Sequence, residues 1–149
     1  MVLWQVLLLI FAIFNLFLFF KGYGECKNRN SFGLTKPLYF LGMYVWGDVF
    51  IFSIFWILIS MFCIVINNFY LFLTFVSLFW VVRSFGETIY WFNQQFSNVK
   101  REPAEKVMFY SIVKNDSVWF IQQIMNQCIT VVALVASIYF ATLWIRSMF

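Results

Sequence analysis

The sequence predicts an all-α integral membrane protein built as a bundle of four transmembrane helices. Its 149 residues are 64% hydrophobic and only 11% charged, whereas about a quarter of the residues of a soluble domain are charged. Aromatic residues make up 24% of the chain, a fraction that suits side chains facing acyl chains and lipid headgroups. We therefore expect a multi-pass membrane protein with a single transmembrane domain over residues 1–149.

The first predicted span covers residues 2–20, which contain no charged side chain. At about 1.5 Å per residue, a helix of this length crosses the roughly 30 Å hydrocarbon core of a bilayer. The segment lacks the basic start and the small-residue cleavage site of a signal peptide. We therefore expect it to stay in the protein as the first helix.

Residues 37–96 are apolar almost throughout and are about twice as long as one crossing requires. Asn67–Asn68 is the most suitable break, because asparagine tolerates left-handed backbone and hydrogen-bonds its own main chain. Pro37 suits the first position of a helix, where its missing N–H has no partner to lose. The sequence therefore predicts two antiparallel spans, over residues 38–66 and 69–93.

A polar stretch follows Ser97, and Pro103 then opens a segment whose apolar residues recur at helical spacing. These residues are Val107, Met108, Phe109, Ile112 and Val113. The pattern predicts a short cytoplasmic amphipathic helix that lies on the membrane surface before the fourth span. The fourth span itself is predicted over residues 118–145.

The distribution of basic residues predicts the orientation, because Lys and Arg accumulate on the cytoplasmic side of a membrane. Eight of the ten fall in the first and third connecting loops, which are therefore predicted to be cytoplasmic, with both termini outside. A charge divided between two short loops does not form one nucleic-acid-binding patch, so no nucleic-acid partner is expected. The eight residues are Lys21, Lys27, Arg29 and Lys36 in the first loop and Lys100, Arg101, Lys106 and Lys114 in the third.

Three charged residues inside the predicted spans form the candidate ion- or solute-binding site: Asp48, Arg83 and Glu87. In a hairpin centred on Asn67–Asn68, Asp48 lies level with Glu87, and Arg83 lies roughly 5–6 Å further along the axis. Charges in hydrocarbon are costly, so they are expected to meet. If all three ionise, their charges sum to minus one, and the spare carboxylate should bind a proton or a cation.

Further polar residues are expected to line this site and to pack the helices. Asn15, Gln123 and Asn126 fall in the same cytoplasmic half, within roughly 8–15 Å of the surface. Small and polar residues also recur every three or four positions along the fourth span, which predicts a helix-packing stripe. The stripe runs from Gln123 and Asn126 through Thr130, Ala133, Ser137 and Ala141.

The charged trio has a second, purely structural interpretation, in which it locks the second span to the third. Glu87 would then be hydrated near the cytoplasmic boundary, or Asp48 would bond Tyr44 and backbone groups. The sequence alone leaves the binding site and the structural lock open as alternatives.

Enzymatic activity is the least expected class of function. The chain has no His, no nucleophile elbow and no glycine-rich phosphate loop. Cys26, Cys63 and Cys128 are isolated from one another, so neither a metal site nor a cofactor is predicted.

Two hypotheses of function follow. The first is a channel- or transporter-like protein with a cation or proton site open to the cytoplasm, which the clustering of polar groups at one depth favours. The second is a non-catalytic accessory or assembly subunit of a larger membrane complex. The expected partners are the lipid bilayer and either further copies of the chain or another membrane protein.

Overall fold

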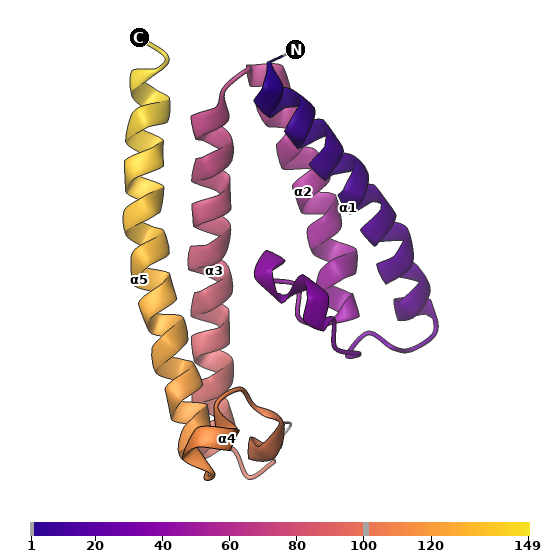
Figure 1. Cartoon of the computed structure of the whole chain (residues 1–149), viewed down its shortest axis with the longest axis vertical. Helices are drawn as coiled ribbons and strands as arrows, with labels where there is room; N and C mark the ends of the chain where they lie inside the picture. The colour runs from indigo at the N-terminus through magenta and orange to yellow at the C-terminus, as the bar shows by residue number, and fades with distance from the viewer. Residues whose placement is uncertain (1, 100–101) are drawn as a thin grey trace. The chain divides into compact units, whose positions relative to one another are not determined.

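The computed structural model describes residues 2–99 and 102–149, which form helices joined by short loops (Figure 1). In chain order the elements are α1 (Leu3–Lys27), η1 (Lys36–Leu41), α2 (Trp46–Ile66), α3 (Phe69–Phe96), η2 (Ala104–Lys106), α4 (Tyr110–Val113) and α5 (Ser117–Arg146). Helices α1, α2, α3 and α5 are long and apolar enough to cross a membrane. The structure thus confirms an all-helical chain with four candidate membrane spans.

The second spanning helix begins at Trp46 and not at residue 38, so the predicted start was wrong. Pro37 does open a helix, but that helix is the 3-10 helix η1, which ends at Gly42 in left-handed backbone with φ 71°. Val45 is then extended and forms an isolated antiparallel bridge with Leu34. The absence of charged side chains from residues 38–45 made this segment resemble a continuation of the helix that follows.

The segment after Pro103 is not the single amphipathic helix that the sequence predicts. It forms the three-residue η2 and the four-residue α4. Between them Val107 is extended and Phe109 is left-handed with φ 70°, so the helical hydrogen-bond pattern cannot continue. Lys100 and Arg101, which contribute to the predicted orientation, lie outside the described residues.

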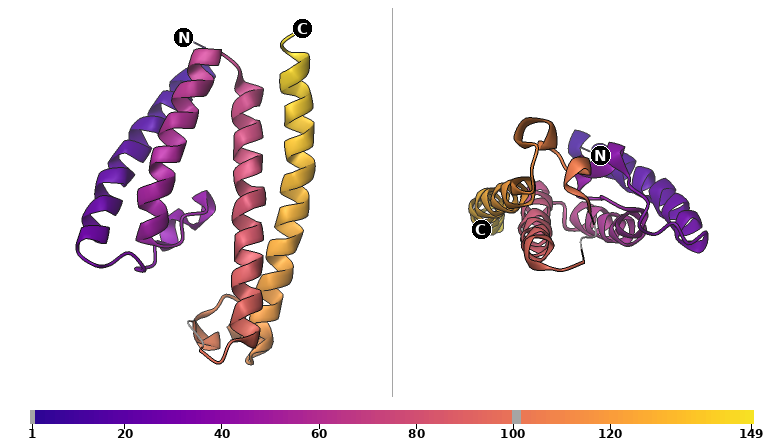
Figure 2. Two further views of the ribbon diagram at one scale, coloured as in Figure 1. Left: turned by 180° about the vertical axis from the view of Figure 1, so that it is seen from behind. Right: turned by 90° about the horizontal axis from the view of Figure 1, so that it is seen from below.

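The chain divides into two compact units, and each is described by itself. The first unit contains residues 1–75 and 141–149, and the second contains residues 76–140. Helices α1 and α2 lie side by side in the first unit, and α3 and α5 lie side by side in the second (Figure 2). The bundling of all four spans and their orientation in a membrane stay predictions.

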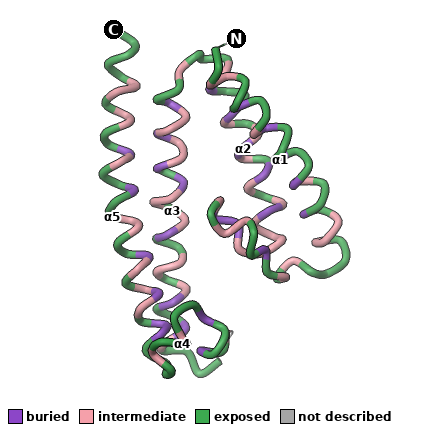
Figure 3. The backbone as a smooth tube through the Cα atoms, in the orientation of Figure 1, coloured by how far each residue is buried: buried purple, intermediate pink, exposed green. Residues whose placement is uncertain are grey.

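In the first unit, α1 and α2 bury matching rows of residues that recur every three or four positions (Figure 3). This spacing is typical of two helices packed with interlocking side chains. Several members are small or polar, which allows the helices to approach closely. The rows are Leu8, Ala12, Asn15, Leu18 and Gly22 on α1, and Val49, Ser53, Trp56, Ser60 and Cys63 on α2.

Gly22 marks a particularly close approach between these two helices. A Cβ atom added to Gly22 would lie 2.9 Å from the backbone nitrogen of Phe50 and 3.1 Å from its Cα. Both atoms belong to the backbone, which cannot rotate away as a flexible side chain does. The absence of a side chain at residue 22 is therefore a packing requirement of the α1–α2 pair.

The Asn67–Asn68 turn joins three helices of the first unit. Asn67 has left-handed backbone with φ 56° and ends α2, as the sequence predicts. Gln5 Nε2 on α1 donates to Asn67 Oδ1 at 2.9 Å, and Asn68 Nδ2 donates to Ser147 Oγ, just beyond α5, at 2.6 Å. The two amide side chains thus connect the turn to both terminal helices.

In the second unit, the loop between α3 and α5 folds onto the ends of those helices. Ala104 and Val107 are buried in a hydrophobic cluster with Trp91, Val118 and Trp119. Gln94 Nε2 on α3 also donates to the backbone oxygen of Glu102 at 2.8 Å. The loop is therefore held by apolar packing and by at least one hydrogen bond.

Candidate functional site

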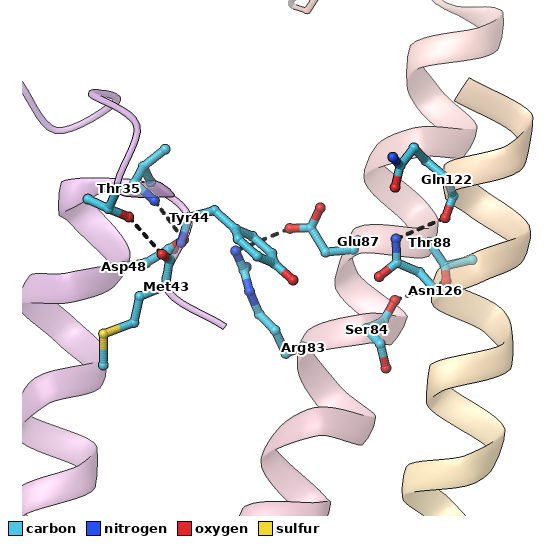
Figure 4. A network of polar contacts seen from close by, with 11 residues as sticks. Thr35, Met43, Tyr44, Asp48, Arg83, Ser84, Glu87, Thr88, Gln122 and Asn126 are labelled. Atoms are coloured by element: carbon cyan, nitrogen blue, oxygen red, sulfur yellow. Dashed lines mark hydrogen bonds and ion pairs between the residues drawn. The ribbon is translucent and has the colours of Figure 1, made fainter. Parts of the chain in front are cut away.

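Asp48 is the third residue of α2 and caps the amino-terminal end of that helix. Its Oδ2 accepts hydrogen bonds from the backbone N–H groups of Tyr44 at 3.0 Å and Val45 at 3.3 Å (Figure 4). A carboxylate at this position also interacts favourably with the partial positive charge of the helix terminus. These contacts match the structural interpretation in which Asp48 bonds Tyr44 and backbone groups.

Arg83 and Glu87 form an ion pair within α3. The Arg83 Nη2 and Glu87 Oε1 atoms are 3.2 Å apart, and the two side chains are only 18% and 16% exposed. A spacing of four residues places such side chains on the same helix face, where opposite charges stabilise the helix. The pair carries no net charge.

Hydroxyl and amide groups connect α3 to α5. Ser84 Oγ lies 2.8 Å from Thr130 Oγ1, and Gln95 Nε2 donates to Gln123 Oε1 at 2.7 Å. Ser84 Oγ also donates to the backbone oxygen of Trp80. In lipid, where apolar contact gives little net attraction between helices, such bonds contribute directly to helix association.

The two predicted lining asparagines are buried and bond within their own helices. Asn126 Nδ2 donates to Gln122 O at 2.9 Å (Figure 4). Asn15 is fully buried on α1, and its Nδ2 donates to Phe11 O at 2.8 Å. Among the described residues, Asn15 Oδ1 has no hydrogen-bond partner.

The predicted packing stripe on α5 is mostly buried in its middle. Ala133 and Ser137 are buried, Thr130 and Ala141 are partly buried, and Ser137 Oγ donates to Ala133 O at 2.7 Å. The side chains of Thr130 and Gln123 both contact α3. Ala141 belongs to the first unit, whereas the rest of the stripe belongs to the second.

The structure thus brings together some of the predicted site residues but not all of them. It pairs Arg83 with Glu87 and connects Gln123 to α3 through Gln95. Asp48 belongs to the first unit and Arg83 and Glu87 to the second, so their meeting in one site stays a prediction.

Sequence reasoning missed Gln95 and the two asparagine contacts of the Asn67–Asn68 turn. It also missed the buried row of α2, although Ser53 and Ser60 stand seven residues apart, a spacing that places them on one helix face. That signal was present in the sequence, since both serines lie inside the predicted span 38–66.

Within the described part of the chain, no three His, Cys, Asp or Glu side chains gather as candidate metal ligands. No protein-family model, curated protein or solved structure matches the chain. The function of the chain is therefore inferred from its own contacts.

Proposed function

We propose that this small membrane protein is a non-catalytic accessory or assembly subunit of a larger membrane complex. The observation that carries the proposal is that Asp48 and Glu87 both contact groups of the chain itself. Asp48 caps α2 through two backbone amides, and Glu87 pairs with Arg83 on α3. Each carboxylate thus has partners inside the chain, which supports a structural role for both.

The depth of these groups supports the same proposal. Asp48 precedes the end of α2 at Ile66 by about 27 Å of helix, and Glu87 follows the start of α3 at Phe69 by about the same length. The hydrocarbon core is roughly 30 Å thick. Each carboxylate therefore lies near one end of its crossing, where headgroups and water reduce the cost of a charge.

Several of the remaining polar side chains of the spans hold helices together. The pairs Ser84–Thr130 and Gln95–Gln123 connect α3 to α5, and Gln5–Asn67 connects α1 to the turn after α2. The exposed faces of the helices are mainly apolar, as on α5. Large apolar side chains exposed there include Val131, Val132, Leu134, Val135, Ile138 and Tyr139. Such faces suit lipid and the helices of a partner protein.

Purification from native membranes in a mild detergent tests the proposal. We expect the chain to elute in a complex with a different membrane protein at a fixed ratio. The complex should persist in Asp48→Asn and Glu87→Gln variants, because neither residue is expected to contact the partner. A chain that elutes only with copies of itself would contradict the accessory role.

A channel- or transporter-like function with a cytoplasmic cation or proton site is the second candidate. The observation that favours it is the low exposure of the Arg83–Glu87 pair, 18% and 16%, in a helix able to cross a membrane. Ionisable residues in spanning helices often mark ion pathways. In this candidate Asp48 joins the pair, Asn15, Gln123 and Asn126 line the path, and several copies enclose it. Ion flux into proteoliposomes distinguishes it from the accessory role.

A further inference from the structure

The loop between α1 and α2 exposes basic and large apolar side chains together. We call residues 27–45 the α1–α2 loop. Lys27, Arg29 and Lys36 are exposed. Phe32 is 89% exposed, Leu34 56% and Phe40 71%. Exposed large apolar side chains beside basic residues are typical of segments that bind membrane surfaces.

The α1–α2 loop has a defined internal structure that holds these side chains outward. Thr35 and Met43 are buried, and Thr35 Oγ1 donates to Met43 O at 2.7 Å. The backbone N–H of Thr35 donates to Tyr44 O at 2.9 Å, and that of Trp46 donates to Gly33 O at 3.1 Å. The side chain of Thr35 therefore points into the loop, whereas those of Phe32 and Leu34 are exposed.

The length of α2 places this loop at the membrane boundary. The helix has 21 residues, which correspond to about 31 Å and thus to the thickness of the hydrocarbon core. The loop ends where α2 begins, at Trp46, so it lies at the end of that crossing, among the lipid headgroups. Lys21 Nζ lies 5.0 Å from the ring centre of Trp46, and Trp and basic side chains are both enriched at this level of a bilayer.

The backbone of Arg29 makes this residue a suitable site for testing the role of the basic charges. Asn30 N donates to Glu25 O at 3.0 Å in the bond that closes a helix carboxyl terminus, and Arg29 between them has φ 61°. Glycine is the preferred residue in this left-handed position, because a Cβ atom is strained there. Arginine is therefore less stable than glycine at this position, and replacing Arg29 by glycine removes the charge without adding backbone strain.

We propose that the α1–α2 loop binds the headgroups of anionic phospholipids in the membrane leaflet that it faces. Lys27, Arg29 and Lys36 contact the lipid phosphates, while the exposed apolar side chains enter the layer below the headgroups. Basic clusters beside a spanning helix bind anionic lipid in this way. The inference does not depend on the accessory role, because a transporter could carry the same loop.

Lipid binding to the purified chain in a zwitterionic detergent tests the proposal. Phosphatidylglycerol and phosphatidylcholine with identical acyl chains are compared by native mass spectrometry. We expect wild type to bind phosphatidylglycerol more tightly, and Arg29→Gly to weaken that binding by about fivefold, the effect of one basic residue at a membrane surface. Arg29→Gly should not lower the melting temperature, since glycine relieves the left-handed backbone.

Arg146→Gln is the matched control, because it also removes one basic charge. Arg146 ends α5 beside Ser147, which bonds Asn68 in the turn at the opposite end of α2. This variant should keep the full preference for phosphatidylglycerol. Lys36→Gln should weaken phosphatidylglycerol binding as Arg29→Gly does, although Lys36 does not have left-handed backbone. Equal binding of the two lipids by wild type, or an unchanged preference in both Arg29→Gly and Lys36→Gln, would overturn the proposal.

A photo-crosslinking amino acid in place of Phe32 tests what covers the loop in native membranes. We expect irradiation to attach phospholipid, and the adduct mass to match an anionic class. Attachment to a protein would contradict the proposal and would instead identify the loop as a protein contact.

Discussion

The guanidinium of Arg83 lies 3.2 Å from the carboxylate of Glu87, one turn further along the same helix. The two opposite charges thus face each other within α3. Asp48 is likewise held by the backbone amides that precede α2. Both arrangements supply polar partners that lower the cost of placing charged side chains in membrane-spanning helices.

A double-mutant cycle on this pair tests whether it stabilises the fold. Arg83→Met and Glu87→Gln should each lower the free energy of unfolding in detergent by about 1 kcal/mol, because each leaves a partly buried charge unpaired. The double variant should lose less than the sum of the two, with a coupling of at least about 0.5 kcal/mol. Glu105→Gln, which alters an exposed acidic residue of η2, is the control and should have little effect. Additive losses would show that the pair does not interact energetically.

Substitutions of Asp48 distinguish a helix cap from an ion ligand. Asp48→Ala should lower the free energy of unfolding by about 1 kcal/mol, because both amide donors lose their acceptor. Asp48→Asn keeps an acceptor oxygen and should cost only a few tenths of that amount. Thermal unfolding in detergent measures both changes. Equal losses in the two variants would mean that the charge, and not the hydrogen bonds, is what matters.

Gly22 and Gly24 form a matched pair of sites on α1. Gly22→Ala should destabilise the protein by about 1–3 kcal/mol, because the new Cβ atom would meet the Phe50 backbone at 2.9 Å. Gly24→Ala, where nothing lies within 4 Å of the added atom, should be neutral or stabilising by up to about 1 kcal/mol. Melting temperatures of the two variants provide the test. A similar response at both sites would contradict the close approach of α1 to α2.

Glu102 predicts a pH dependence in the loop that precedes α5. Burial raises the pKa of the Glu102 carboxyl above its ordinary value, despite the hydrogen bond from Tyr90 and the charge of Lys106. The folded loop therefore favours the protonated acid. The protonated Glu102 carboxyl contributes fully to the stability of the folded loop below the ordinary pKa of a glutamate. This contribution is lost as the pH rises through the raised pKa of Glu102 in the folded loop.

Hydrogen exchange measures this effect when wild type and Glu102→Gln are compared at equal pH. Amides of residues 102–113 should exchange alike in the two proteins at acidic pH. Near neutral pH they should exchange faster in wild type, since only wild type then carries the partly buried charge. A constant ratio across the pH range would contradict the prediction.

The sequence predicted those structural features that depend only on residues close together in the chain. Asn67 was expected at a left-handed turn, because asparagine tolerates that backbone, and its φ of 56° confirms the turn. Likewise, the four-residue spacing of Arg83 and Glu87 already placed them one turn apart on a helix.

The start of α2 could not be predicted in this way. It depends on a backbone bridge between Leu34 and Val45, and nothing in the hydropathy of either residue requires that pairing. The misplaced start in turn made Asp48 look like a residue deep within a span. Contacts of Asp48 with Tyr44 and backbone groups were one of the interpretations that the sequence left open, and the position of Asp48 in the first turn of α2 identifies them as a helix cap.

The central claim is that the charged residues of α2 and α3 stabilise the fold and do not form an ion pathway. Ion and proton flux into proteoliposomes tests this claim most directly. The account predicts that wild type, Asp48→Asn and Glu87→Gln all remain at the level of empty liposomes over a range of pH. Flux through wild type that exceeds this level and is abolished in a stably folded Glu87→Gln variant would contradict it.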